Sequence, residues 1–137
     1  MTPADLLEAC RDLLRRPAFA GAGGWSRAIA LLARQALEKA VEEFWKASPA
    51  TAGLCHCPRK TQFTCLPFYL HPLLARDVGY VWSALSNVCH YHPYELAPTA
   101  AELGGWIEAV ATLLAAIGDS EAQSEISLLK RRGQGDA

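Results

Sequence analysis

The residues from 25 to 47 constrain the fold most, because they carry one long helical pattern. Apolar residues recur three or four positions apart and form one stripe, consisting of Ile29, Leu32, Ala36, Ala40 and Phe44. Charged residues occupy the opposite face, and pairs of opposite sign stand four positions apart, which supports a helix. The sequence therefore predicts an amphipathic helix from Trp25 or Ser26 to about Ala47, which must bury its stripe against other elements.

Three more helices are predicted from periodicity and end signals. Thr2 with Pro3 begins a first helix that ends near residue 16, before Pro17. Another runs from about Leu73 to Cys89 or His90 on a stripe of large apolar residues. A capping box at 99–102 starts the next helix, which continues to Gly118, where glycine favours a left-handed stop.

The end of the chain and the region between 49 and 72 carry weaker patterns. A short fifth helix is expected from Asp119 or Ser120 to Leu129, followed by a frayed tail from about residue 131. Residues 49–72 include several prolines and cysteines without a clear period, which indicates a long irregular loop. No run alternates long enough for a sheet. The prediction is an all-α protein, one domain over residues 1–137, built as a single bundle of four to five helices.

Composition limits the partners. The net charge of −1 gives no broad positive field, so a nucleic acid must be held at a local site. The N-terminal residues lack the pattern of a secretory signal, and no uncharged apolar stretch of about twenty residues is present, so we expect a cytoplasmic protein with no membrane partner. Five cysteines are an odd number, which favours free thiols or a metal over a disulfide framework.

The segment from 86 to 95 holds the densest set of reactive side chains. It includes two histidines, two tyrosines and a carboxylate, which supply a group that titrates near neutral pH together with hydrogen-bond donors and an acceptor. The alternative is that these residues only fill and cap the end of the bundle. The candidate site residues are Ser86, Asn87, His90, Tyr91, His92 and Glu95.

The helix LLARQALEKAVEEFW, a later helix ending in polar residues and histidine, a short turn and a long closing helix together resemble the HEPN domain family. Members of that family are small helical bundles in bacterial toxin, defence and RNA-processing systems. Many are metal-independent ribonucleases whose motif is an arginine, then four to six residues of any kind, then a histidine, and two such motifs meet across a dimer. The resemblance implies that His92, or else His90, is the motif histidine and that the chain forms a homodimer.

The arginine of that motif has no match in this chain. Counting back from His92 places it between Leu85 and Asn87, where the residues are leucine, serine and asparagine. The cation that would stabilise a phosphate-centred transition state is therefore missing from the motif. Arg76 lies about 20 Å from His90 along the same helix, at 1.5 Å per residue, so within one subunit it cannot share a phosphate with that histidine.

A second candidate site is the cysteine-rich part of the predicted loop. Cys55, Cys57 and Cys65, with His56, supply soft ligands of the kind that zinc prefers, and a metal would tie down an irregular segment. His71 or His92 are other candidates for the fourth ligand. The alternative is a set of reduced thiols packed on the bundle.

Three functions follow from these observations. The first is a HEPN-like protein that acts on RNA in a toxin or defence system, as an endoribonuclease with no cofactor. The second is a non-catalytic module that binds another protein, for which the absent arginine argues. The third is a zinc-stabilised structural protein centred on the cysteines.

Overall fold

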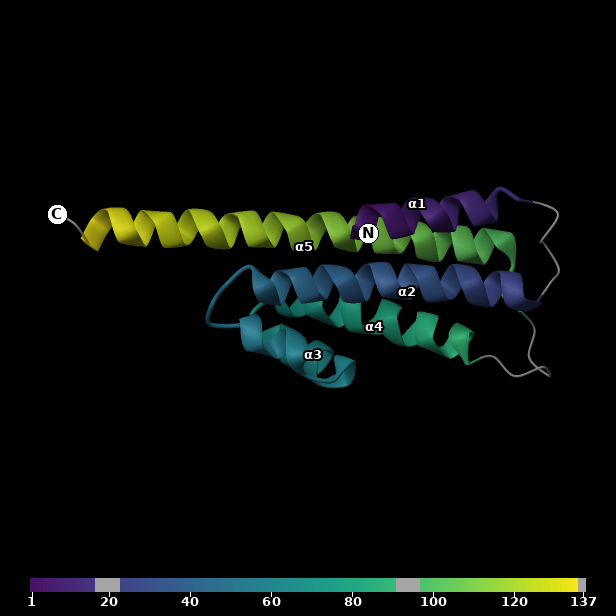
Figure 1. Ribbon diagram of the computed structural model, residues 1–137, viewed down its shortest axis with the longest axis horizontal. Helices are drawn as coiled ribbons and strands as arrows, with labels where there is room; N and C mark the ends of the chain where they lie inside the picture. Colours follow the sequence, from purple (N-terminus) through teal and green to yellow (C-terminus); the bar gives the residue numbers. More distant parts are fainter. Residues whose placement is uncertain (17–22, 91–96, 136–137) are drawn as a thin grey trace.

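The computed structural model describes residues 1–16, 23–90 and 97–135, except for the side chains of 124–128. Five α-helices and two short 3₁₀ helices make up this part of the chain, which includes no strand. Figure 1 shows α1, α2, α4 and α5 lying side by side, with α3 beside the bundle. The predicted all-α bundle is confirmed.

The predicted start of the first helix is confirmed in detail. Helix α1 spans Pro3–Leu14, and the Thr2 side chain accepts a hydrogen bond from the Asp5 backbone amide while the Asp5 carboxylate accepts one from Thr2. This reciprocal cap satisfies amides that the first turn leaves unpaired. Helix α1 packs on α2 and α5 and buries Leu6, Leu7 and Cys10.

Helix α2 is the centre of the bundle and contacts α1, α4 and α5. It spans Gly23–Lys46, close to the predicted bounds. Its buried residues include Ile29, Leu37 and Val41, and Trp45 is fully buried near its end. Helix α4 covers Pro72–Cys89, also as predicted, and buries Val78, Val81 and Leu85.

The long irregular loop predicted for 49–72 is wrong in its local structure. The segment forms the 3₁₀ helix η2 (Ala52–His56), helix α3 (Arg59–Cys65) and the 3₁₀ helix η3 (Leu66–Phe68). Prolines stand at the start of two of these pieces: Pro58 is the N-cap of α3, and η3 has proline in its first turn. Each piece is too short to show a helical period, which is why periodicity missed them.

The predicted break at Gly118 is also wrong. Helix α5 runs without interruption over 36 residues, Ala100–Gly135, so no separate fifth helix begins in this range, and the tail predicted from about residue 131 is helical as far as Gly135. Gly118 is not in the left-handed conformation that would end a helix. A glycine inside a helix costs only about 1 kcal/mol relative to alanine, which the neighbouring turns offset.

One part of the described chain is long and apolar enough to cross a membrane, judged by length and composition alone. It is Ala100–Gln123 in α5, with a mean hydropathy of 1.4 over its most apolar window. Leu103, Ile107 and Val110 of this stretch are buried in the bundle core. A core helix meets the same criterion, so this feature does not identify a membrane segment.

Candidate functional site

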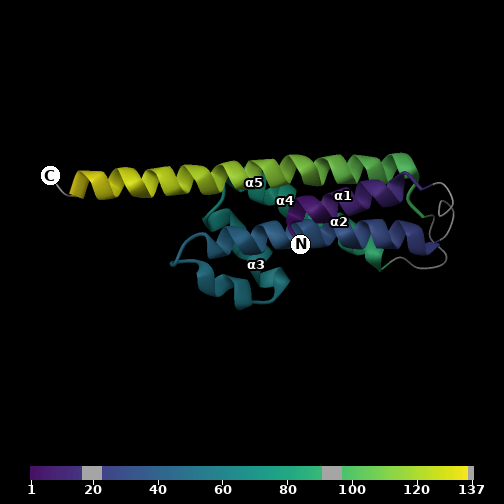
Figure 2. The same cartoon turned by 45° about the horizontal axis from the view of Figure 1, so that its top comes forward.

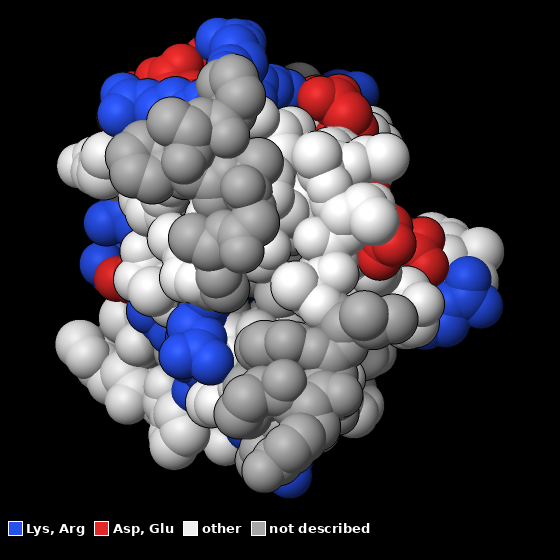
Figure 3. All heavy atoms as spheres, turned by 90° about the vertical axis from the view of Figure 1, so that its right-hand side faces the viewer, with Lys and Arg blue, Asp and Glu red and all other residues white. Residues whose placement is uncertain are grey.

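Four helix ends meet at one end of the bundle. The ends of α1 and α4 and the beginnings of α2 and α5 lie together there, on the right in Figure 1. Figure 3 looks onto this end: Lys and Arg lie across the top of the view, beside Asp and Glu, and also recur down its left side, where little Asp or Glu is seen. Local positive charge is thus present on a chain whose net charge is −1.

The last turn of α4 presents part of the predicted site at this end. Asn87 and His90 are exposed and stand three positions apart, a spacing that places both on one side of a helix. His90 is the C-cap of α4, and its backbone amide donates to the Ser86 and Val88 carbonyls. Ser86 is half-buried, and its hydroxyl donates to the Trp82 carbonyl oxygen at 2.8 Å. The predicted residues Tyr91, His92 and Glu95 lie outside the described residues.

Arg34 of α2 is held beside α4 through Glu38, whose partner Trp82 stands one helical turn before Ser86. Arg34 Nε lies 3.5 Å from Glu38 Oε1, and the same oxygen accepts a hydrogen bond of 3.0 Å from Trp82 Nε1. The Arg34 contact is an ion pair that lacks the alignment of a hydrogen bond, since Nε is buried without a hydrogen-bond partner. Glu38 therefore links Arg34 of α2 to Trp82 of α4. Trp82 stands one turn before Ser86, so this contact lies close to the candidate residues.

The thiol of Cys89 is sensitive to the charges around the end of α4. Burial raises the pKa of Cys89, and the positive charges of Arg34 and Arg27, both on α2, act in the opposite direction. Both arginines are therefore close enough to influence a group next to His90. The raised pKa keeps Cys89 protonated at neutral pH, which argues against its use as a nucleophile.

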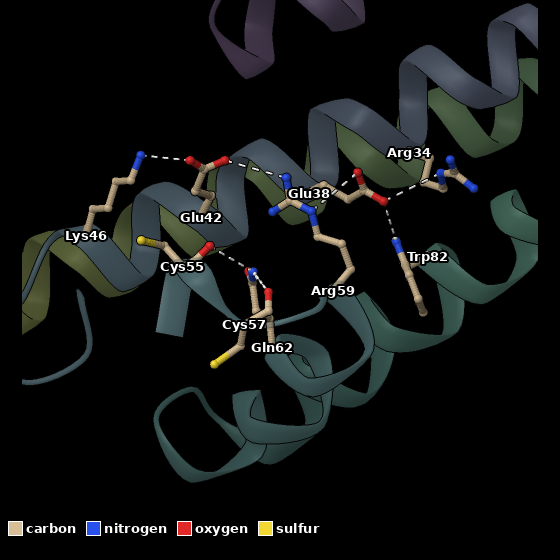
Figure 4. A network of polar contacts seen from close by, with 9 residues as sticks. All are labelled: Arg34, Glu38, Glu42, Lys46, Cys55, Cys57, Arg59, Gln62 and Trp82. Carbon is tan, nitrogen blue, oxygen red and sulfur yellow. Dashed lines mark hydrogen bonds and ion pairs between the residues drawn. The ribbon is translucent and has the colours of Figure 1, made fainter. Parts of the chain in front are cut away.

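Arg34 belongs to a wider polar network, shown in Figure 4. Arg59 of α3 contacts both Glu38, at 3.7 Å, and Glu42, at 3.6 Å. Lys46 Nζ donates to Glu42 at 2.7 Å and lowers the pKa of that carboxyl. Three cations thus share two carboxylates, which leaves an excess of positive charge along this side of α2.

The same network, and not a cluster of cysteines, ties residues 52–68 to the bundle. Gln62 is 1% exposed and donates from Nε2 to the backbone oxygens of Cys55, at 3.3 Å, and Cys57, at 2.8 Å. The Phe63 ring stacks on Trp82 with centroids 4.6 Å apart. The Gln62 hydrogen bonds hold the segment together internally, whereas the Phe63–Trp82 stacking and the Arg59 ion pairs attach it to the bundle, the role that the sequence pattern attributed to a metal.

The predicted zinc ligands are not gathered into a site. Cys55, Cys57, Cys65 and His56 are all described, and no three His, Cys, Asp or Glu side chains in the described ranges form a group suited to a metal ion. The three cysteines are free and half-buried, and His56 is exposed. This geometry gives no support to zinc, and measured zinc content remains the decisive test.

Sequence reasoning missed the two arginines of α2. It searched for a cation along the chain near the histidines, whereas Arg27 and Arg34 come from a helix more than fifty residues earlier. The sequence held no signal for this role, because Arg34 lies opposite the apolar stripe of α2 and only the structure shows that it is 22% exposed. A half-buried arginine indicates a neighbouring element that covers it.

The fold and the site define an all-α bundle with a polar, locally cationic end. Comparisons with protein-family models, curated proteins and solved structures give no match to this chain.

Proposed function

We propose that this chain is a HEPN-like cytoplasmic protein that binds single-stranded RNA at the end of α4 and cleaves it without a metal, as part of a toxin or defence system. The observation that carries the proposal is that α2 packs along α4, so that the charges of Arg27 and Arg34 act on Cys89 in the last turn of α4. A neighbouring helix thereby supplies the positive charge that the resemblance predicts but the motif lacks.

The residues around the end of α4 take distinct roles in the proposed reaction. Arg27 is exposed and neutralises a phosphate, while half-buried Arg34 adds a fixed positive charge behind it. His90 accepts the proton of the 2′-hydroxyl or donates one to the leaving oxygen. Asn87 donates an amide hydrogen bond to phosphate. Ser86 is a weaker candidate than Asn87, because its proton is already donated to Trp82.

The test measures binding and cleavage separately on the purified full chain in EDTA. A mixed pool of labelled single-stranded RNA is titrated by fluorescence anisotropy at several salt concentrations and is then analysed for cleavage products. Arg27→Ala is expected to weaken binding about three- to tenfold at low salt and to reduce the salt slope by about one. His90→Ala and His92→Ala are expected to reduce cleavage while binding is retained.

Arg76→Ala is the matched control, since Arg76 is an exposed arginine of α4 that lies far from His90. It should leave binding and cleavage unchanged. The proposal fails if folded wild-type protein neither binds nor cleaves the RNA pool, or if Arg76→Ala weakens binding as much as Arg27→Ala. Either result would make the second candidate function the first choice.

The second candidate is a non-catalytic module that binds another protein. Large apolar side chains are exposed at the junction of α3 and α4: Phe68 is 82% exposed, Leu73 57% and Tyr69 55%. Clustered exposed apolar residues are typical of protein-binding surfaces. Phe68→Ser with Leu73→Ser would abolish such binding and leave RNA binding intact, which separates the two functions.

A further inference from the structure

The C-terminal part of α5 extends beyond every other helix. Figures 1 and 2 show this projection in two orientations, with the C-terminus at its far tip. We call residues 118–135 the α5 extension. Ile117, at 2% exposure, is the last buried side chain in the described part of α5. Leu129 is 66% exposed, and all residues from 129 to 135 are exposed.

No side chain that the structure describes in the extension is buried, so this helix lacks the usual source of helical stability there. Most helices in proteins are held by packing of an apolar face, because propensity alone gives marginal stability in water. The extension also contains Gly118, Gly133 and Gly135, and glycine is a poor helix former. A packing partner that covers the extension would supply the helical stability that the projecting helix lacks.

The order of the charged residues along the extension favours a second, antiparallel copy of this chain as the packing partner. Asp119, Glu121 and Glu125 stand in its first half, and Lys130, Arg131 and Arg132 stand near its end. In the sequence, the apolar residues Ile126, Leu128 and Leu129 come between the two groups. Two parallel copies would place like charges together, whereas two antiparallel copies place each acidic group beside the basic group of the other.

We propose that the α5 extensions of two copies of this chain pair in antiparallel fashion about a two-fold axis, and so form a homodimer. The surface is self-complementary, as a two-fold interface requires. The extension projects away from the end of α4, where His90 is the C-cap (Figure 1), so this pairing keeps the candidate RNA sites of the two copies apart and is distinct from the meeting of two motifs that the family resemblance implies.

Charge reversal in the full-length chain tests the arrangement by sedimentation velocity over a range of concentrations. A basic-end variant carries Lys130→Glu, Arg131→Glu and Arg132→Glu. An acidic-end variant carries Asp119→Lys and Glu121→Lys. Each is expected to weaken self-association about tenfold or more, because like charges then oppose each other in the antiparallel pair. The variant that combines all five changes should dimerise again.

The combined variant distinguishes antiparallel pairing from the alternatives. In a parallel pair, reversal at one end leaves like charges opposite like charges, so it changes little. In a dimer formed through α4, none of these variants changes self-association. Either result, or a wild-type protein that stays monomeric at every concentration, overturns the proposal. Thermal unfolding of each variant verifies that the bundle is intact, and RNA binding by the monomeric variants shows that the two proposals are tested separately.

Discussion

At the scale of single residues, Glu38 links three elements of the fold. Its carboxylate accepts a hydrogen bond from Trp82 of α4 and forms ion pairs with Arg34 of α2 and Arg59 of α3. The side chain is 15% exposed, so solvent compensates little for a lost partner. Glu38 therefore positions Arg34 for the proposed phosphate site and also anchors the short helices.

Glu38→Gln is expected to lower the free energy of unfolding by about 1–3 kcal/mol, because two partly buried arginines lose the charge that they share. Urea denaturation followed by circular dichroism measures the change. Glu43→Gln is the matched control, since Glu43 is an exposed glutamate of the same helix. Equal effects of the two substitutions would show that Glu38 is not a structural link.

At the scale of elements, the continuity of α5 through Gly118 is the main departure from the sequence pattern. Ser120 donates its hydroxyl proton to the Ala116 carbonyl oxygen at 3.0 Å, and this contact spans the predicted break. The Gly118 position has open space around it, since a Cβ atom added there would meet no other atom within 4 Å beyond its own stretch of helix. An alanine therefore fits without a clash.

Gly118→Ala is expected to raise the free energy of unfolding by about 0.5–1 kcal/mol and to increase the helical signal in circular dichroism, because alanine has the higher helix propensity. Gly135→Ala, at the last residue of α5, serves as the control and should have no effect. If Gly118→Ala is instead destabilising, the backbone at this position is left-handed and the helix ends there, as the sequence pattern suggested.

At the scale of the whole molecule, the protein divides into a packed bundle and a projecting helix. Arg11 of α1 illustrates how the bundle is closed at its surface: it contacts Glu8 at 2.8 Å and Glu108 of α5 at 3.3 Å. Such exposed pairs contribute little to stability. The apolar core that α2 shares with α1, α4 and α5 supplies most of it.

A chain that ends after Gln123 is expected to keep the bundle. At concentrations too low for self-association its melting temperature should change by less than about 2 °C, because the removed residues add no buried side chain that the structure describes. Differential scanning calorimetry measures the change. A chain that ends after Thr112 also loses Leu113 and Ile117, and it should lose cooperative unfolding. Equal melting temperatures of the two shortened chains would contradict the division into a packed bundle and a projecting helix.

The sequence by itself determined the helices that carry long local patterns. The capping box at Thr2 and the periodic stripes specified α1, α2, α4 and the start of α5, because helix formation depends on residues within a few turns. It also placed Asn87 and His90 at the end of a helix. Tyr91, His92 and Glu95 stay predictions, since they lie outside the described residues.

Only the tertiary structure decided what depends on distant parts of the chain. Helix α3 is held by Glu38 and Trp82, which no local window around residue 60 includes. Gly118 stays helical because local propensity signals are weak compared with the turns on both sides. The charges of Arg27 and Arg34 act on Cys89 at the end of α4 only because α2 and α4 pack together. The physical reason is that packing brings together residues that the chain separates, and local sequence does not encode this proximity.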